Sequence, residues 1–244
     1  MNPRVTIITP TVGTQYVKKN IESVAAQTYK NIQHLVVIDG VKFEETFKLN
    51  NGELPPSLDL ITLPKNTGYD GFNGHRIYGG CTFLAEGDYI MFLDEDNWID
   101  PEHVESLVEI AEAYKWAYSL RKITDMEGNF ICNDDCESLG DYLSVINDFF
   151  IDVNCFFLPK RIALMWAPIW YRRARHPDDQ PEVDRLLSYL LRDAKIPSGG
   201  SGQYTVNYRA GNRSDSVRPE FFLQGNEIMM KKYNGDLPWR KRKT

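Results

Sequence analysis

The sequence contains no apolar run of the roughly 18 residues that a membrane-spanning helix requires. Its first residues, MNPRVTIITP, lead directly into a predicted strand, without the layout of a signal peptide. Both absences favour a cytoplasmic protein. The basic C-terminal tail, residues 231–244, leaves two interpretations open: a solvated chain end, or an electrostatic contact with a partner or with anionic lipid that would make the protein peripheral to a membrane.

Cysteine is also scarce, and basic residues are fewer than acidic ones. The chain has 4 cysteines, and the neighbouring Cys132 and Cys136 have no second pair at the spacing of a zinc site. This usage suits a reducing compartment better than a disulfide scaffold. The 28 basic side chains are outnumbered by 34 acidic ones, for a net charge of −6, which argues against a nucleic-acid-binding protein with a broad basic face.

What the first 115 residues do contain is a regular alternation of strand and helix patterns. Short β-branched and apolar runs predict strands at 4–10, 31–40, 58–64 and 88–94. Apolar residues at helical spacing predict helices at 15–28, 75–87 and 100–114, whereas 41–58 and 65–74 read as loops. This alternation predicts a mostly parallel, Rossmann-like α/β sheet flanked by helices.

The pattern changes after residue 115. Two strands are predicted within 116–134, a strand running into a helix within 152–168, a helix at 181–194 and a final strand at 202–211. We find no internal repeat, so we expect one globular unit spanning 1–244. Within it, residues 1–115 form one half, residues 116–230 the second half, and residues 231–244 the basic tail.

Three consecutive carboxylates follow the buried strand predicted at 88–94. Asp94, Glu95 and Asp96 should repel one another unless a cation compensates their charge. The carboxyl ends of parallel strands meet at one edge of a sheet, where ligands of such folds bind. Mg²⁺ and Mn²⁺ prefer oxygen ligands and often share them with phosphates. The cluster therefore fits a metal–diphosphate site, although three solvated turn residues would have the same sequence.

Two segments together resemble family 2 glycosyltransferases of the GT-A fold. The first is VTIITPTVGTQYVKKNIESVAAQTYKNIQHLVVIDG and the second is GHRIYGGCTFLAEGDYIMFLDEDNWIDPEHVESLV. The likeness covers residues 4 to about 114. It implies an enzyme that transfers a sugar from a nucleotide-diphosphate sugar to an acceptor, usually with inversion and with Mn²⁺ or Mg²⁺. UDP-sugar is the favoured donor and GDP-sugar a possible one, and the acceptor could be a glycan, a lipid-linked molecule or a small molecule.

The resemblance also implies roles for individual residues. Asp39 would hydrogen-bond the donor base, and Arg76 would contact the base or the diphosphate. Asp94 and Glu95 would lie beside the ribose and the metal, and Asp96 would be the metal ligand, with Asp94 as a second one. The nucleotide pocket would be lined by Thr9, Pro10 and Thr11.

The chain departs from the family pattern at the first two strand ends. Thr11 stands where the family often has a tyrosine that stacks on the base, and Ile38 replaces the first of two aspartates. The pocket could therefore hold its base differently, and the donor nucleotide stays open.

An inverting transferase also needs a general base for the acceptor hydroxyl. In similar proteins this carboxylate lies at the N-terminal end of a later helix, which points here to RHPDDQPEVDRLLSYLL, residues 175–191. Asp184 is the first candidate, Asp179 the second and Glu182 the third. All three could instead be acidic residues that favour the first turn of a helix.

Two other functions fit the same pattern. A non-catalytic protein could keep the fold and bind a nucleotide sugar without turnover. A sugar nucleotidyltransferase has a related sheet but a glycine-rich, basic loop after its first strand, where this chain has only Gly13 and no arginine before Lys18.

Overall fold

The structure is a computed structural model that describes residues 2–55, 58–172, 183–211 and 216–242. The N-terminal half contains the elements β1 (Val5–Thr11), α1 (Val17–Ala25), β2 (Ile32–Ile38), α2 (Glu44–Asn51), β3 (Leu58–Thr62), α3 (His75–Leu84), β4 (Tyr89–Phe92) and α4 (His103–Ala111). The predicted strand–helix alternation is confirmed. The segment predicted as a loop at 41–58 was wrong in part, because it holds α2.

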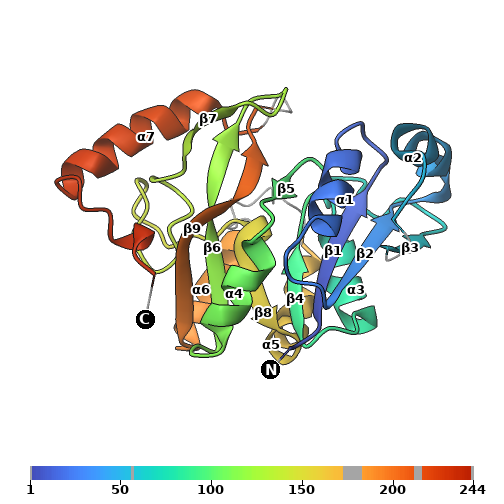
Figure 1. The fold of residues 1–244 in the computed structure, drawn as a ribbon, viewed down its shortest axis with the longest axis horizontal. Coiled ribbons are helices and arrows are strands. Elements are labelled where there is room, and N and C mark those ends of the chain that lie inside the picture. Colours follow the sequence, from blue (N-terminus) through green and yellow to red (C-terminus); the bar gives the residue numbers. More distant parts are fainter. Residues whose placement is uncertain (1, 56–57, 173–182, 212–215, 243–244) are drawn as a thin grey trace.

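The second half contains β6 (Trp116–Thr124), β7 (Phe130–Asn133), β8 (Phe156–Pro159), α5 (Lys160–Trp166), α6 (Val183–Asp193), β9 (Ser198–Arg209) and α7 (Pro219–Lys232). The two-residue strand β5 (Trp98–Ile99) comes from the N-terminal half and pairs with β9. Short 3-10 turns lie at Val41–Phe43, Val153–Cys155, Ala167–Trp170 and Pro238–Arg240. Figure 1 shows the two halves side by side, with α7 along the outer end of the second. None of the helices in the described ranges is long and apolar enough to span a membrane.

One sheet runs through both halves in the order β3-β2-β1-β4-β8-β6-β9-β5, and β7 pairs with β6. The strands β3, β2, β1 and β4 are all parallel. β8 then pairs antiparallel with β4. As a result, the residues that follow β4 lie at the same edge of the sheet as the residues that precede β8, and this edge carries the candidate site.

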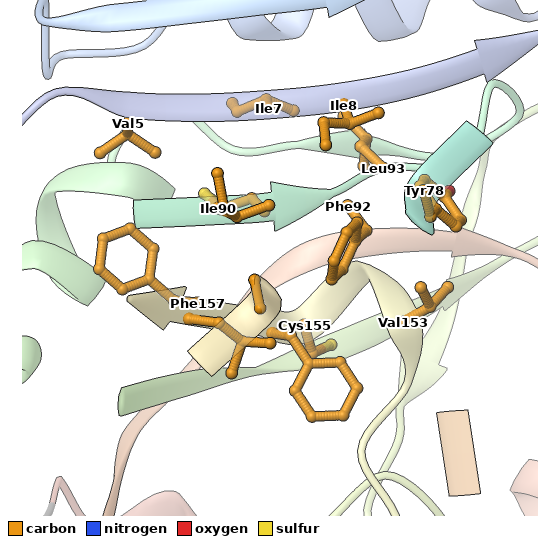
Figure 2. Packing of buried hydrophobic residues seen from close by; sticks show 14 of the residues in the cluster. Val5, Ile7, Ile8, Tyr78, Ile90, Phe92, Leu93, Val153, Cys155 and Phe157 are labelled. Atoms are coloured by element: carbon orange, nitrogen blue, oxygen red, sulfur yellow. The ribbon is translucent and has the colours of Figure 1, made fainter. Parts of the chain in front are cut away.

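The main core lies between the sheet and its helices. Ile7, Ile8, Ile90 and Phe92 from the central strands are at most 1 % exposed, and Phe157 from β8 packs beneath them (Figure 2). Burying side chains of this size stabilises the fold by about 1.5–3 kcal/mol each. Because the central strands are buried on both faces, their ends are held in fixed positions at the edge of the sheet.

A second apolar cluster joins the C-terminal segment to β6 and β9. Phe222 and Met229 of α7 pack there with Leu120, and Trp239 is 2 % exposed. Arg240 forms an ion pair with Asp135 at 2.5 Å. The tail therefore packs against the second half, and Arg242 pairs with Glu109 of α4 at 3.0 Å, so the described part of the tail is not a solvated chain end.

Helix α7 was not predicted. Gly225 interrupts its pattern, and a Cβ atom at this position would come within 2.6 Å of the Cys136 Sγ. The glycine thus permits close packing of α7 on the loop that carries Cys136. Its low helix propensity also makes the helix harder to predict from the sequence.

Candidate functional site

A cleft of about 470 Å³ opens at the carboxyl edge of the parallel strands. From the N-terminal half it is lined by Pro10, Thr11, Asp39, Asn66, Asp94, Glu95 and Asp96. From the second half it is lined by Asp152, Trp170, Asp184, Tyr208 and Arg209. The strand ends that the sequence predicted to meet therefore share one cavity with carboxylates from the second half.

Asp39 lies at the end of β2 and is 3 % exposed. Its Oδ1 accepts hydrogen bonds from the backbone N–H and the hydroxyl of Thr67, at 2.6 and 2.8 Å. Its Oδ2 accepts from the Asn66 Nδ2 and the Gly68 N–H, at 2.7 and 2.8 Å. Both oxygens therefore have two donors within the protein, and the carboxylate fixes the loop 66–68 at the cleft wall.

Asp94 begins the acidic turn after β4 and is fixed on both of its oxygens. The Tyr78 hydroxyl donates to Oδ1 at 2.6 Å, and the Asn154 Nδ2 donates to Oδ2 at 3.1 Å. The Asp94 N–H in turn donates to the Asn154 Oδ1 at 2.7 Å. Burial raises the pKa of Asp94, although the Tyr78 and Asn154 hydrogen bonds oppose that shift.

Glu95 turns toward the loop that follows β1. Its Oε2 accepts from the Thr11 hydroxyl at 2.5 Å and from the Thr14 N–H at 3.2 Å. Burial raises the pKa of Glu95, and these hydrogen bonds partly offset the effect. Thr11 lines the cleft with its neighbour Pro10, as the resemblance implies.

The rest of the acidic turn is held by main-chain contacts. The Arg209 Nε donates to the Asp96 carbonyl at 3.2 Å, and the Arg209 N–H donates to the Asn97 Oδ1 at 3.0 Å. The Asn20 Nδ2 donates to the Asp94 and Asn97 carbonyls, at 2.9 and 3.1 Å. A rigid turn thus places the Asp96 side chain at the cleft.

The described residues contain no group of three or more His, Cys, Asp or Glu side chains that could hold a metal ion by itself. A cation that shares its coordination sphere with a diphosphate and water does not need such a group. The Asp96 carboxylate supplies the hard oxygen donor that Mg²⁺ or Mn²⁺ prefers, so the donor type fits. Tyr78 and Asn154 each donate to one Asp94 oxygen, and Asp94 stays a predicted second ligand.

Two of the predicted donor-binding residues are not among those that line the described part of the cleft. The Thr9 hydroxyl lies 3.0 Å from the His34 Nε2, inside the sheet. The Arg76 guanidinium lies 3.5 Å from the Phe72 ring and donates to the Thr67 carbonyl at 3.2 Å. Donor contacts from these two residues stay predictions, and in this structure Arg76 supports the same loop that Asp39 fixes.

Asp184 lies in the first turn of α6 and lines the same cleft as the acidic turn. Asp179 and Glu182, the other two candidates for the base, lie outside the described residues. Of the three predicted carboxylates, the structure therefore describes one, and it borders the same cavity as Asp96.

Sequence reasoning missed Asp152 and Asn154, which border or support the cleft. They precede β8, and their place beside Asp94 follows from the antiparallel pairing of β8 with β4. The polar residues of DVN before the apolar FFL were a usable signal. Using it required knowing the direction of β8.

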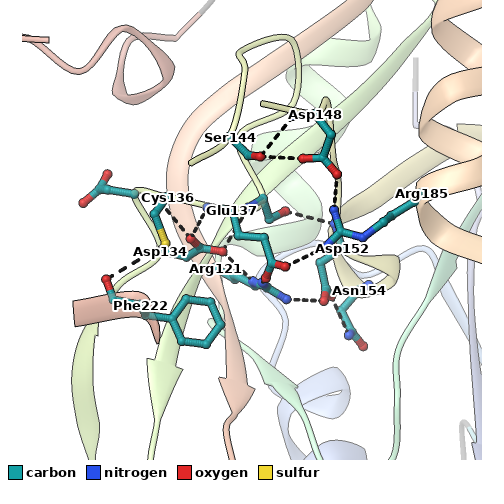
Figure 3. Close-up of polar contacts among 12 residues, drawn as sticks. Arg121, Asp134, Cys136, Glu137, Ser144, Asp148, Asp152, Asn154, Arg185 and Phe222 are labelled. Carbon is teal, nitrogen blue, oxygen red and sulfur yellow. Dashed lines mark hydrogen bonds and ion pairs between the residues drawn. The ribbon is translucent and has the colours of Figure 1, made fainter. Parts of the chain in front are cut away.

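A buried ionic cluster behind the cleft was also missed (Figure 3). Arg121 in β6 is 2 % exposed and pairs with Asp134 at 2.8 Å, Glu137 at 2.5 Å and Asp152. Burial alone would lower the pKa of Arg121, but the three carboxylates hold it well above its ordinary value. The guanidinium therefore stays charged and can hold all three carboxylates.

Comparison with known proteins identifies the family. The model of glycosyl transferase family 2 matches residues 6–135, which is more than half of the chain. This chain belongs to glycosyl transferase family 2. The matched segment includes β1 except for Val5, all of β2, β3 and β4, and the acidic turn.

Several curated relatives match over part of the same region. Glycosyltransferase GlyA of Streptococcus pneumoniae is 26% identical over 124 residues, which cover 47% of this chain and 16% of the relative. An uncharacterized glycosyltransferase of Rickettsia prowazekii is 34% identical over 111 residues, covering 45% and 32%. A glucosyl-dolichyl phosphate glucuronosyltransferase of Haloferax volcanii is 31% identical over 94 residues, covering 38% and 28%. The alignments thus span a third or less of each relative.

Solved structures match over almost the whole chain. The crystal structure of S. aureus TarS in complex with UDP-GlcNAc covers 97% of this chain and 68% of its own, with a TM-score of 0.56 and 16% identity. A structure of TarS without that ligand in its description gives a TM-score of 0.55 over 97% of this chain. The likeness confirms the predicted fold class, a curled and mostly parallel GT-A sheet flanked by helices.

Proposed function

We propose that this family 2 member is a metal-dependent, inverting glycosyltransferase that transfers a sugar from a nucleotide-diphosphate sugar to an acceptor hydroxyl. The observation that carries the proposal is that carboxylates from both halves border one cleft, among them Asp96 and Asp184. A UDP-sugar is the first donor to test, because the similar TarS fold was solved with UDP-GlcNAc. A GDP-sugar is the second donor class, and the acceptor class is a glycan, a lipid-linked molecule or a small molecule.

In the proposed reaction, the acceptor oxygen attacks the anomeric carbon from the face opposite the diphosphate. The new C–O bond forms while the bond between the anomeric carbon and the diphosphate oxygen breaks. The electron pair of the broken bond leaves with the diphosphate. Asp184 accepts the hydroxyl proton as the general base, and the configuration inverts because attack and departure occur on opposite faces.

Asp96 is the proposed ligand of Mn²⁺ or Mg²⁺. A divalent cation bound there would supply positive charge for the leaving diphosphate. Asp94 and Glu95 then hold the shape of the acidic turn through Tyr78, Asn154 and Thr11. Both carboxylates are partly buried, so their charges add to the negative field that favours a cation at the cleft.

The test measures UDP release from UDP-GlcNAc and UDP-glucose, with and without Mn²⁺ and with a panel of acceptors. The wild type should turn over only with the cation, and Asp96→Asn should lose the stimulation by Mn²⁺. Asp184→Asn should lower kcat by roughly 10²–10⁴-fold, as expected for loss of a general base. The control is Asp236→Asn, which removes an exposed carboxylate paired with Lys241 and should leave kcat unchanged.

Four outcomes would contradict the proposal. Wild-type activity in Asp96→Asn would remove the metal assignment, and wild-type activity in Asp184→Asn would remove the base. A rise in melting temperature with UDP and Mn²⁺ but no turnover on any acceptor would favour the non-catalytic alternative. Release of pyrophosphate from a nucleoside triphosphate would favour a nucleotidyltransferase.

A further inference from the structure

Arg185 follows the proposed base, Asp184, and both terminal nitrogens of its guanidinium donate hydrogen bonds. The Arg185 NH2 donates to the Glu137 Oε1 at 2.6 Å, and its NH1 donates to the Asp148 Oδ2. The same guanidinium lies 4.1 Å from the centre of the Phe150 ring. These three contacts attach the first turn of α6, which carries Asp184, to the loop 134–152.

Glu137 connects this anchor to the buried cluster. While its Oε1 accepts from Arg185, its Oε2 accepts from the Arg121 NH2 at 2.5 Å. Burial raises the pKa of Glu137, and the neighbouring guanidiniums of Arg121 and Arg185 oppose that shift. One carboxylate thus lies between two arginines, one from β6 and one from α6 (Figure 3).

The contacts continue from Arg121 to the acidic turn. Arg121 pairs with Asp152, whose Oδ1 accepts from the Asn154 Nδ2 at 2.7 Å. Asn154 also contacts Asp94 through both of its amide atoms, at 2.7 and 3.1 Å. An unbroken path of hydrogen bonds therefore runs from Arg185, beside the proposed base, to Asp94 on the donor side.

Stability alone does not account for this arrangement. Two guanidiniums meet four carboxylates, namely Asp134, Glu137, Asp148 and Asp152. Desolvating such charges costs about as much as their attraction returns, and apolar replacements are often as stable. What the ionic arrangement provides is geometry, because a planar guanidinium fixes the direction of each carboxylate that it binds.

We propose that Arg185 and Glu137 are positioning residues that fix the place of Asp184 relative to the acidic turn on the donor side of the cleft. The inference rests on the proposed function, because it assigns these residues a role in that same reaction. Arg185 does not line the cleft in the described part of the chain, so it acts through the placement of α6. Its loss should misplace the base without disturbing the binding of the nucleotide.

The test compares Arg185→Met, Arg185→Lys and Glu137→Gln with the control Arg192→Met. Arg192 is on the same helix and covers the Phe149 ring at 3.3 Å, without an ion pair to the buried cluster among the described contacts. Arg185→Met should lower kcat for transfer at least tenfold, while KM for the donor and the affinity for UDP stay within twofold. Arg185→Lys should recover part of kcat, because an ammonium restores the charge but cannot bind both carboxylates in the same geometry.

Hydrogen exchange gives a second readout that does not depend on turnover. In Arg185→Met the amides of residues 187–190, whose hydrogen-bond acceptors lie in the first turn of α6, should lose protection, whereas in Arg192→Met they should match the wild type. Unchanged protection of these amides, or a kcat within twofold of the wild type, would overturn the positioning role. Failure of the proposed function has a different signature, namely a wild type that transfers no sugar or an Asp184→Asn variant with full activity.

Discussion

Replacing Asp39 by asparagine tests the account of the cleft wall most directly. Each Asp39 oxygen accepts two hydrogen bonds, and one donor on each oxygen is a backbone N–H. The amide of asparagine turns one oxygen into an NH2 group, whichever way it is oriented. The Thr67 hydroxyl and the Asn66 amide can rotate to accommodate that group, but the backbone N–H of Thr67 or Gly68 cannot.

The expected cost follows from this single orphaned donor. A buried donor without a partner costs about 1–3 kcal/mol. For a chain of this size, each kcal/mol shifts the melting temperature by roughly 2–4 °C. We therefore expect Asp39→Asn to melt about 2–12 °C below the wild type. UDP affinity should also fall, since the loop fixed by Asp39 lines the cleft with Asn66 and Gly68.

The measurement is thermal unfolding of the wild type and Asp39→Asn, with and without UDP and Mn²⁺. The exposed Asp236→Asn variant is the control, and its melting temperature should stay close to that of the wild type because surface pairs contribute little. A wild-type melting temperature for Asp39→Asn would refute the hydrogen-bond account. A lowered melting temperature with unchanged UDP affinity would show that the loop 66–68 does not contribute to nucleotide binding.

Three further predictions concern neighbouring features. Gly68→Ala should melt below the wild type and bind UDP more weakly in a titration, because a Cβ there would come within 2.3 Å of the Asn73 carbonyl oxygen. Tyr78→Phe should lower the free energy of unfolding by about 1.5–3 kcal/mol in urea titrations, since Asp94 loses a buried donor. Burial lowers the pKa of His34 and of His103 from 6.5 to about 3. Between these two pH values both histidines are protonated in the unfolded chain but stay neutral in the folded protein, so protonation favours unfolding. Unfolding free energy should then drop from pH 7 to pH 5 by about 2 kcal/mol for each histidine, and His103→Gln should remove half of that drop.

The N-terminal half was predictable because its signals are local. The central strands are short runs rich in β-branched and apolar residues, and the residues at their ends, Thr11, Asp39 and Asp94, are polar. Because these strands pair in parallel, their carboxyl ends lie at one edge of the sheet, and the direction of the strands alone predicts this. The location of the cleft followed from the order of the elements alone.

The second half was less predictable because its pairings are not local. Arg121 lies within WAYSLRKIT, which reads as an ordinary strand. Its partners lie 13, 16 and 31 residues further along the chain, on a loop whose path no periodicity describes. The sequence shows that the cluster has the charges it needs, but it does not show which charges meet.

Residue roles were harder to predict than residue positions, and Asp39 shows why. The resemblance assigns it to the donor base, yet both of its oxygens already have two partners within the protein. A base N–H could bind Asp39 only by displacing one of these donors, and the Asn66 amide and the Thr67 hydroxyl are the two side-chain donors that can rotate away. If the Asn66 amide moves away when the nucleotide base binds, Asp39 can have both the role that the resemblance implies and the contacts that this structure shows. If UDP binding to Asn66→Ala equals that of the wild type and binding to Asp39→Asn is weakened, Asp39 acts on the base through the loop instead.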